Sequence, residues 1–331
     1  HLIVDGISWR ILLEDLQLLY LQLHQAGTAQ LPLKSFSTKD WVERLQTLER
    51  SSEIPYWHTV TQAELAPLPV DFAGGDNTMA QAETFSVALT VDETRCLLQE
   101  VPAAYPVQMN DLLLTALGLA LKPWAGPTLR LAVEGHGRPD DLDLSRTVGW
   151  LTALYPLLIK LPEQEELGAI IKAVKETVRS VPDQGLGYGI LRYLQGHAVP
   201  ATETPIRFNY LGQTDQLFAN SEWFTSAPES TGSSRSPYGC RDVLIEINAV
   251  ISQGHLKLHW TYSRRLHRQG TISDLARAHV EQLRGLMEYC LSADTDPGYS
   301  PADFPQMALA QDELDQLLDT LDFSIVGGQD G

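Results

Sequence analysis

Hydrophobic residues recur along this chain with two different spacings, and the order in which those spacings alternate limits the folds that it can adopt. A spacing of three or four residues, typical of a helix that buries one face, runs through residues 12–23, 163–181 and 272–290. The spacing of two that is typical of a half-buried strand runs through residues 85–89, 129–133, 206–211, 243–251 and 256–262. Because the two patterns are mixed without a regular strand–helix–strand alternation, they predict an α+β layered fold.

Side chains that can cap a helix predict where several of these elements begin. Ser8 is expected to cap the first helix, because its hydroxyl can accept a hydrogen bond from a free N–H of the first turn. Thr90 and Glu93 have the spacing of a capping box. Asn110 or Asp111 is expected to cap the apolar helix that follows.

The segments between these elements suggest how the chain is divided. A second short helix is expected near Asp40. Residues 67–81 are rich in Pro, Gly, Asp, Asn and Thr, which favours a crossing between two lobes. Residues after 300 are polar and acidic, and they predict a linker with one short amphipathic helix.

Charge and cysteine content exclude several classes of protein. The 331 residues include 24 Lys and Arg against 42 Asp and Glu, a formal charge of −18, so nucleic acid is not an expected partner. No apolar run reaches the ~18 residues that a membrane span needs, so no membrane partner is expected. The three separated cysteines, Cys96, Cys240 and Cys290, predict reduced thiols in a cytoplasmic protein.

Two motifs could suggest a metal site or a dinucleotide-binding site, but neither has the geometry that such a site requires. His255 and His259 have the spacing of a helical metal site, but they lie in a strand pattern, which places their Cα atoms about 13 Å apart. They are predicted to be surface histidines, and no metal site is expected. Residues 185–189 are glycine-rich, but they lack the GxGxxG spacing and follow a helix, so they do not indicate dinucleotide binding.

Four polar segments remain, each bounded by apolar structure, and each alone has an ordinary structural explanation. Their order, however, resembles that of epimerization domains of nonribosomal peptide synthetases. His1–Gly6 matches the end of the HHxxxDG motif of the condensation superfamily, which alone identifies only that superfamily. The segments EGHGR (134–138) and FNYLGQ (208–213) are specific for the epimerizing branch. The further matching segments are residues 8–12, 110–117, 145–150 and 185–189.

The resemblance covers residues 1 to about 305 and implies a fold like chloramphenicol acetyltransferase, with two lobes in a V and a tunnel at their junction. Residues 1–78 would finish the N-terminal lobe and contain HxxxDG, residues 79–300 would form the C-terminal lobe, and residues 301–331 would be a linker. The sequence starts with His and has no signal peptide, so we expect a fragment that lacks most of the N-terminal lobe. Such a fragment is expected to be poorly active, although its parent domain is competent.

The resemblance also implies a reaction, the L-to-D epimerization of the Cα of an aminoacyl or peptidyl thioester on a carrier protein. Such a reaction needs a base, an acid and stabilisation of the enolate oxygen. Glu134 would be the acid/base residue on one face of the Cα, and His1 its partner on the other. Whether His1 moves protons or stabilises the enolate as an imidazolium stays open, with a two-base cycle preferred.

Supporting roles follow from the same resemblance. Asp5 would orient its loop through an ion pair whose partner the sequence does not identify, and Gly6 would permit a close backbone approach. Asn209 and Tyr210 would donate hydrogen bonds to the thioester or the enolate, and Gln213 would shape the site. No bound metal or cofactor is implied, because the substrate arrives on the 4′-phosphopantetheine arm of the carrier.

The expected partners are an upstream peptidyl carrier domain and neighbouring synthetase domains. Two alternatives remain. A condensation domain would use His1 to assist amine attack on a thioester, but Glu134 and FNYLGQ argue against it. A non-catalytic module would only position carrier proteins, and the intact Glu134, His1 and Asn209 argue against that for the parent domain. The sequence does not indicate which amino acid is epimerized.

Overall fold

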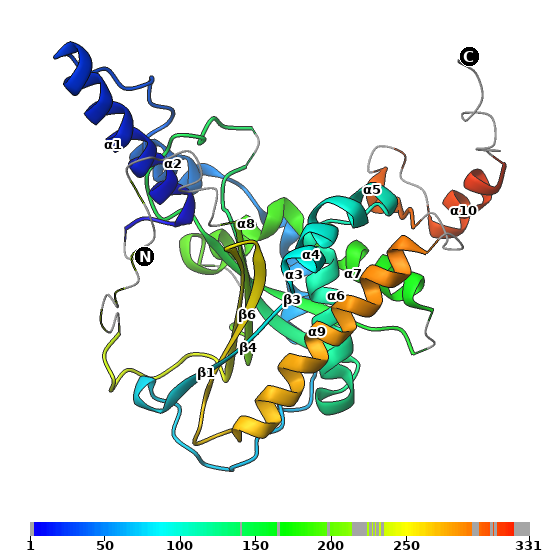
Figure 1. Ribbon diagram of the computed structural model, residues 1–331. Helices are drawn as coiled ribbons and strands as arrows, with labels where there is room; N and C mark the ends of the chain where they lie inside the picture. Colours follow the sequence, from blue (N-terminus) through cyan, green and yellow to red (C-terminus); the bar gives the residue numbers. More distant parts are fainter. Residues whose placement is uncertain are drawn as a thin grey trace.

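A mixed β-sheet forms the centre of the computed structural model (Figure 1). Among the residues that the structure describes, six strands form this sheet in the order β1-β6-β5-β4-β2-β3. The β2–β4 and β4–β5 pairs are parallel, and the other three pairs are antiparallel. The strands are β1 (Ala82–Ala88), β2 (Thr128–Gly135), β3 (Ala153–Lys160), β4 (Ile206–Gln213), β5 (Ile245–Ser252) and β6 (His255–Ser263).

The structure describes most of the chain, with gaps at both ends and between some of the elements. The described residues are 3–139, 141–163, 166–196, 199–213, 224, 227, 229, 232, 235–292, 298–304, 307 and 310–320.

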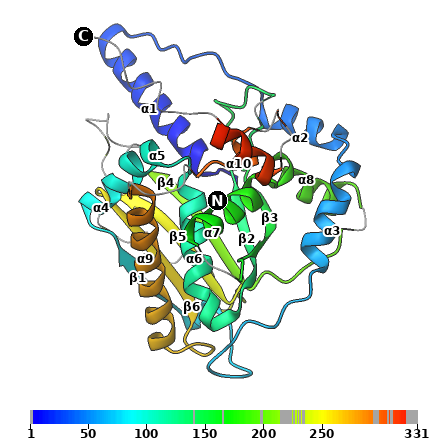
Figure 2. The ribbon, with the colours of Figure 1, turned by 90° about the vertical axis from the view of Figure 1, so that its right-hand side faces the viewer.

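Alternation along the strands gives the sheet one apolar and one polar face. Leu129, Leu131 and Val133 of β2 point into the buried core, together with alternate residues of β4, β5 and β6. Helices α6 (Met109–Ala125), α7 (Leu167–Arg179) and α9 (Gln269–Leu291) pack on this apolar face (Figures 1 and 2). The opposite surface of the sheet is called the polar face below. The α+β prediction is confirmed.

Shorter helices surround this centre. The predicted helices near residues 12 and 40 and after residue 300 are present, whereas α3 and α8 were not predicted. No helix among the described residues is long and apolar enough to cross a membrane. The remaining α-helices are α1 (Gly6–Ala26), α2 (Thr38–Thr47), α3 (Ile54–Gln62), α4 (Val91–Arg95), α5 (Val101–Ala104), α8 (Leu186–Gly189) and α10 (Gln311–Thr320).

Helix α1 projects away from the sheet (Figure 1), and its apolar stripe is exposed. Leu16, Tyr20 and Leu23 are each at least half exposed, while Ser8 and Ile11 near its start are buried. The helix therefore contacts the rest of the protein mainly through its first two turns.

Two of the predicted helix caps are wrong. Helix α1 is capped by Asp5, whose carboxylate accepts a hydrogen bond from the Ser8 backbone N–H, so Ser8 is the donor and not the cap. Helix α6 is capped by Gln108, and Asp111 lies three residues into it as the other half of a capping box. The predicted capping box of Thr90 and Glu93 is confirmed at the start of α4.

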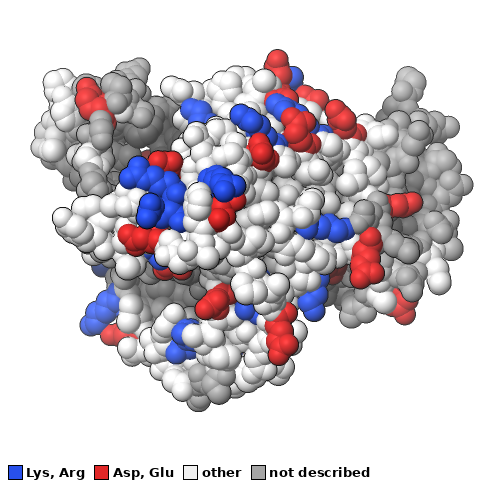
Figure 3. Space-filling view, turned by 90° about the horizontal axis from the view of Figure 1, so that it is seen from below, with Lys and Arg blue, Asp and Glu red and all other residues white. Residues whose placement is uncertain are grey.

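Basic and acidic side chains lie beside one another on the face of the molecule that is seen from below. Figure 3 shows groups of basic side chains on this face with acidic side chains next to them, although the whole chain carries a charge of −18. Arg264, Arg265 and Arg268 are exposed in the turn between β6 and α9. The net charge alone therefore does not describe what each face can attract.

Gly185 provides a test of the packing beside the edge strand β3. Its φ of 86° favours glycine, and an added Cβ would lie 1.9 Å from Cδ1 of Tyr155. We expect Gly185→Ala to lower the free energy of unfolding by roughly 2–4 kcal/mol, from backbone strain plus overpacking. Gly189→Ala is the matched control, because its backbone is helical and its Cβ would meet nothing within 4 Å. Urea unfolding measures both, and equal stabilities of the two variants would contradict this account.

Candidate active site

A row of side chains crosses the polar face of the sheet from β3 to β6. Leu154 is the cross-strand neighbour of Glu134. The parallel register of β2 and β4 pairs Val133 with Phe208, which places Glu134 beside Asn209. Asn209 pairs in turn with Asn248, and Asn248 pairs with His259. The residues of this row come from five strands but lie at one level of the sheet.

Glu134 and Asn209 are in direct contact within this row. The Asn209 Nδ2 donates a hydrogen bond of 2.8 Å to Oε2 of Glu134. Burial raises the pKa of the Glu134 carboxyl, while Arg207 acts in the opposite direction and Glu246 adds to the increase. A carboxyl group whose pKa is raised toward neutrality is a stronger base when ionised, which is the property that proton transfer requires.

Asp5 holds the start of the chain against the segment that follows β2. Its carboxylate forms a buried ion pair with Arg138, with Nη1–Oδ2 of 2.6 Å and Nη2–Oδ1 of 3.2 Å. It also accepts hydrogen bonds from the backbone N–H and the Oγ of Ser8 and from the N–H of Leu151. Burial alone would raise the pKa of Asp5, but the hydrogen bonds from Arg138 and Ser8 outweigh it and lower the pKa.

Gly149 supplies a second attachment for the same loop. Its carbonyl accepts hydrogen bonds from the Asp5 N–H, at 3.2 Å, and from the Ser8 Oγ, at 2.8 Å. Its own N–H donates to the Ser8 Oγ. Arg138 also donates a hydrogen bond to the Thr147 carbonyl, so its guanidinium connects the loop of Asp5 with the segment that contains Thr147 and Gly149. The loop that contains Asp5 is therefore fixed a few residues beyond Glu134, at the end of β2.

The structure brings together only part of the predicted site. Glu134 and Asn209 are in contact, and His1 lies outside the described residues. Gly6 is exposed, and a Cβ there would meet nothing within 4 Å, so the predicted close approach at this position is not seen. Tyr210 packs against the apolar core, on the opposite face of the sheet from Asn209.

Gln213 is the other predicted residue that lies apart from Glu134. It is exposed at the last position of β4, after a register irregularity that begins at Tyr210. It does not share the row formed by Glu134 and Asn209.

Sequence reasoning did not identify Arg207 or Asn248 as parts of this region, and it placed Arg138 in the EGHGR segment without identifying it as the partner of Asp5. Arg207 lies two residues before Asn209 on the same strand, and Asn248 lies on the neighbouring strand. The two-residue period of a strand was the available signal for Arg207, because it places positions 207 and 209 on one face. The partnership of Arg138 with Asp5 spans 133 residues and left no local signal.

The fold and this site define a member of the condensation-domain family. The family model of the condensation domain matches residues 1–307, and the chain belongs to that family.

Solved structures of relatives support the assignment to the condensation-domain family. The epimerization domain from the third module of tyrocidine synthetase B is 41% identical, with a TM-score of 0.79, and the match covers 88% of this chain and 68% of that one. The cyclization-docking bidomain of EpoB from Sorangium cellulosum is 19% identical with a TM-score of 0.62, and it shows the shared fold alone.

Curated relatives match nearly all of this chain. Chondramide synthase cmdD of Chondromyces crocatus is 42% identical over 97% of it, and tyrocidine synthase 2 of Brevibacillus parabrevis is 40% identical over 96%. The chain spans 8% and 9% of the lengths of these two proteins.

Proposed function

We propose that this chain epimerizes the Cα of an aminoacyl or peptidyl thioester that is presented on the phosphopantetheine arm of a carrier protein. The observation that carries the proposal is the Glu134 carboxyl group, half-buried on the polar face, with a raised pKa and a hydrogen bond from Asn209. The 41% identity to a solved epimerization domain supports the same reaction.

In this reaction Glu134 would remove the proton from Cα. The electron pair of the broken C–H bond then moves into the thioester, whose carbonyl oxygen becomes an enolate oxygen. A proton delivered to the opposite face of Cα re-forms the C–H bond with inverted configuration. The carboxylate is a competent base for this step because burial raises its pKa. The higher pKa reduces the difference between the pKa of the carboxyl group and that of the Cα–H group.

Asn209 and the Asp5 loop would assist Glu134 without transferring protons. The Asn209 amide holds one carboxylate oxygen and so restricts the orientation of the group. The ion pair of Asp5 with Arg138 fixes the loop that leads back to His1. We propose His1 as the group on the second face of Cα, either as the acid that returns the proton or as an imidazolium that stabilises the enolate.

One assay separates epimerization from the two alternatives. The synthetase that contains this chain is loaded with an L-aminoacyl or L-peptidyl carrier substrate in deuterated water, and the released product is analysed by chiral chromatography and mass spectrometry. A D/L mixture with deuterium at Cα is expected. A new peptide bond without label would instead indicate condensation, and recovery of unlabelled L-substrate would indicate a scaffold.

The pH dependence of the same exchange tests the role of Glu134. Because the base must be ionised and burial raises its pKa, we expect kcat/KM to fall with decreasing pH through a value above the ordinary 4.5 of this group. A raised pKa also means that the folded state binds this proton more tightly than the unfolded state. The protonated Glu134 carboxyl therefore contributes fully to the free energy of unfolding below pH 4.5, and this contribution is lost as the pH rises through the pKa of Glu134 in the folded state. An acidic limb that survives in Glu134→Gln would contradict this assignment.

A further inference from the structure

A large cavity begins beside Glu134 on the polar face of the sheet. It measures about 1020 Å³, and Leu154, Ala132 and Arg207 contribute to its wall. Leu154 is the cross-strand neighbour of Glu134, and Ala132 lies two residues before Glu134 on the same face of β2. Since directly opposed side chains in a sheet are about 5 Å apart at Cβ, the cavity opens one residue away from the carboxyl group.

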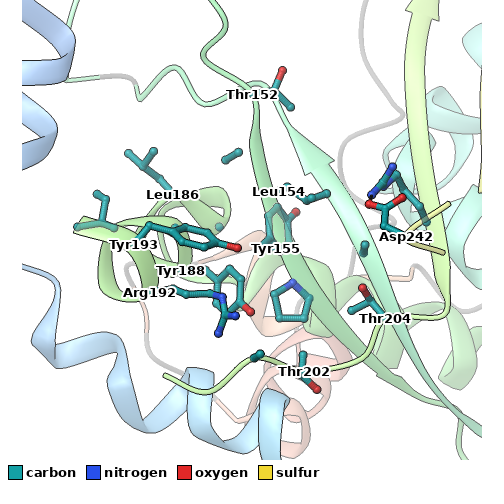
Figure 4. A pocket seen from close by; sticks show the side chains of 18 of the residues that line it. Thr152, Leu154, Tyr155, Leu186, Tyr188, Arg192, Tyr193, Thr202, Thr204 and Asp242 are labelled. Atoms are coloured by element: carbon teal, nitrogen blue, oxygen red, sulfur yellow. Dashed lines mark hydrogen bonds and ion pairs between the residues drawn. The ribbon is translucent and has the colours of Figure 1, made fainter. Parts of the chain in front are cut away.

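The walls of this cavity come from several separate parts of the chain, among them α2, β3, α8, the start of β4 and the segment that leads into β5. Figure 4 shows Tyr188 and Tyr193 on one side, Leu154 and Tyr155 of β3 in the middle, and Asp242 on the other side. The aromatic and aliphatic side chains make the walls mostly apolar. Polar groups form the rest of the wall. They include the hydroxyls of the threonines that Figure 4 labels, the ion pair of Arg207 with Asp242, and the charged side chains of Arg192, Glu203 and Arg241.

The size of the cavity identifies which part of a substrate it could hold. The Cα of a carrier-bound residue bears the thioester carbonyl, the side chain and the nitrogen, and the carbonyl leads back to the carrier arm. Cavities of roughly 300–1,000 Å³ hold drug-sized ligands, so this cavity has room for several residues. A single amino-acid side chain would leave most of it filled with water. The nitrogen substituent, an upstream peptide, is the group that matches the volume.

We propose that the cavity binds the upstream peptide of a peptidyl thioester with apolar side chains, so that the substrate of this chain is peptidyl and not aminoacyl. The inference rests on the proposed function, because it places the reacting Cα at Glu134. The apolar part of the wall would bury the peptide side chains, while the hydroxyls and the charged groups at its margins would form hydrogen bonds with the peptide backbone.

Gly189 offers a way to fill the cavity without disturbing the fold. It lines the cavity, its backbone is helical with φ of −65°, and a Cβ there would meet nothing within 4 Å. Gly189→Phe should therefore place a ring in the cavity at little cost in stability. Gly285→Phe on α9 is the matched control, because its Cβ also meets nothing within 4 Å and Gly285 does not line the cavity.

The test measures binding of two non-hydrolysable pantetheine amides that share one terminal residue, an aminoacyl and a tripeptidyl analogue with apolar residues. Calorimetry with the full chain is expected to give a Kd at least tenfold lower for the tripeptidyl analogue. Gly189→Phe should abolish this preference, and Gly285→Phe should keep it. Equal affinity for the two analogues, or a preference that survives Gly189→Phe, would overturn the inference.

Exchange measurements on the matching thioesters separate this inference from the proposed function. Faster deuterium uptake by the tripeptidyl thioester supports both. Uptake at equal rates by the two thioesters overturns the peptidyl assignment and leaves epimerization standing. Absence of uptake from both thioesters in the synthetase that contains this chain, despite the expected difference in binding, overturns the epimerase function and with it the assignment of the bound peptide as the substrate.

Discussion

Replacing Glu134 by glutamine is expected to reduce the rate of deuterium incorporation at Cα by about 10²–10⁴-fold, the range that removal of a general base produces. Glutamine has nearly the same shape as glutamate and can still accept the hydrogen bond from Asn209, but its amide cannot take a proton. The rate should therefore fall because of chemistry and not because the site collapses. The measurement is single-turnover exchange with a saturating carrier-bound substrate.

Glu246→Gln is the matched control for that variant. Glu246 lies on the polar face beside Arg207, and its charge contributes to the raised pKa of Glu134, but it does not contact Glu134 through a hydrogen bond in the described structure. Its removal should shift the acidic limb of the pH profile slightly downward and change the maximal rate only a few-fold. If Glu134→Gln kept a tenth or more of the wild-type rate, Glu134 would not be the base.

The sequence predicted Glu134 and Asn209 as site residues because the segments EGHGR and FNYLGQ resemble those of epimerization domains. The local strand pattern only placed the two residues on strands, Glu134 after three alternating apolar residues of β2 and Asn209 within β4. The same alternation shows why Tyr210, which was expected to donate to the substrate together with Asn209, does not share a face of the sheet with it. Adjacent residues of a regular strand point to opposite faces, and Tyr210 packs with the core.

Among the elements that were not predicted, β3 and α3 were missed for different physical reasons. The strand β3 contains the run of Pro156, Leu157, Leu158 and Ile159, which does not alternate because the middle of β3 is buried on both faces. Its proline is compatible with a strand since β3 lies at the edge of the sheet. The helix α3 is only nine residues long, and a window that short carries little periodic signal.

The caps of α1 and α6 were wrong because several polar residues compete within a few positions. At α1, both Asp5 and Ser8 can act as a cap, and tertiary contacts decide between them. Asp5 is fixed in place by Arg138, which is distant in the sequence, so its carboxylate is already positioned to accept from Ser8. A local rule does not include that long-range interaction.

The ion pair of Asp5 with Arg138 leads to a large expected effect on stability. Arg138→Ala is expected to lower the free energy of unfolding by about 3–5 kcal/mol at neutral pH, because it leaves the buried carboxylate of Asp5 without its cation. The hydrogen bonds from Ser8 and Leu151 remain and place the expected loss toward the lower end. Urea unfolding at several pH values measures this loss.

The pH dependence and a surface control make this prediction specific to the buried pair. The folded-state pKa of Asp5 is lowered, so its stabilising contribution is present above the unfolded pKa and disappears as the pH falls through the folded pKa. Arg138→Ala should therefore cost less at acidic pH. Arg10→Ala breaks the exposed pair with Glu14, at 3.8 Å, and should cost less than about 0.5 kcal/mol. Similar losses for Arg138→Ala and Arg10→Ala would mean that this ion pair does not fix the Asp5 loop beside Glu134.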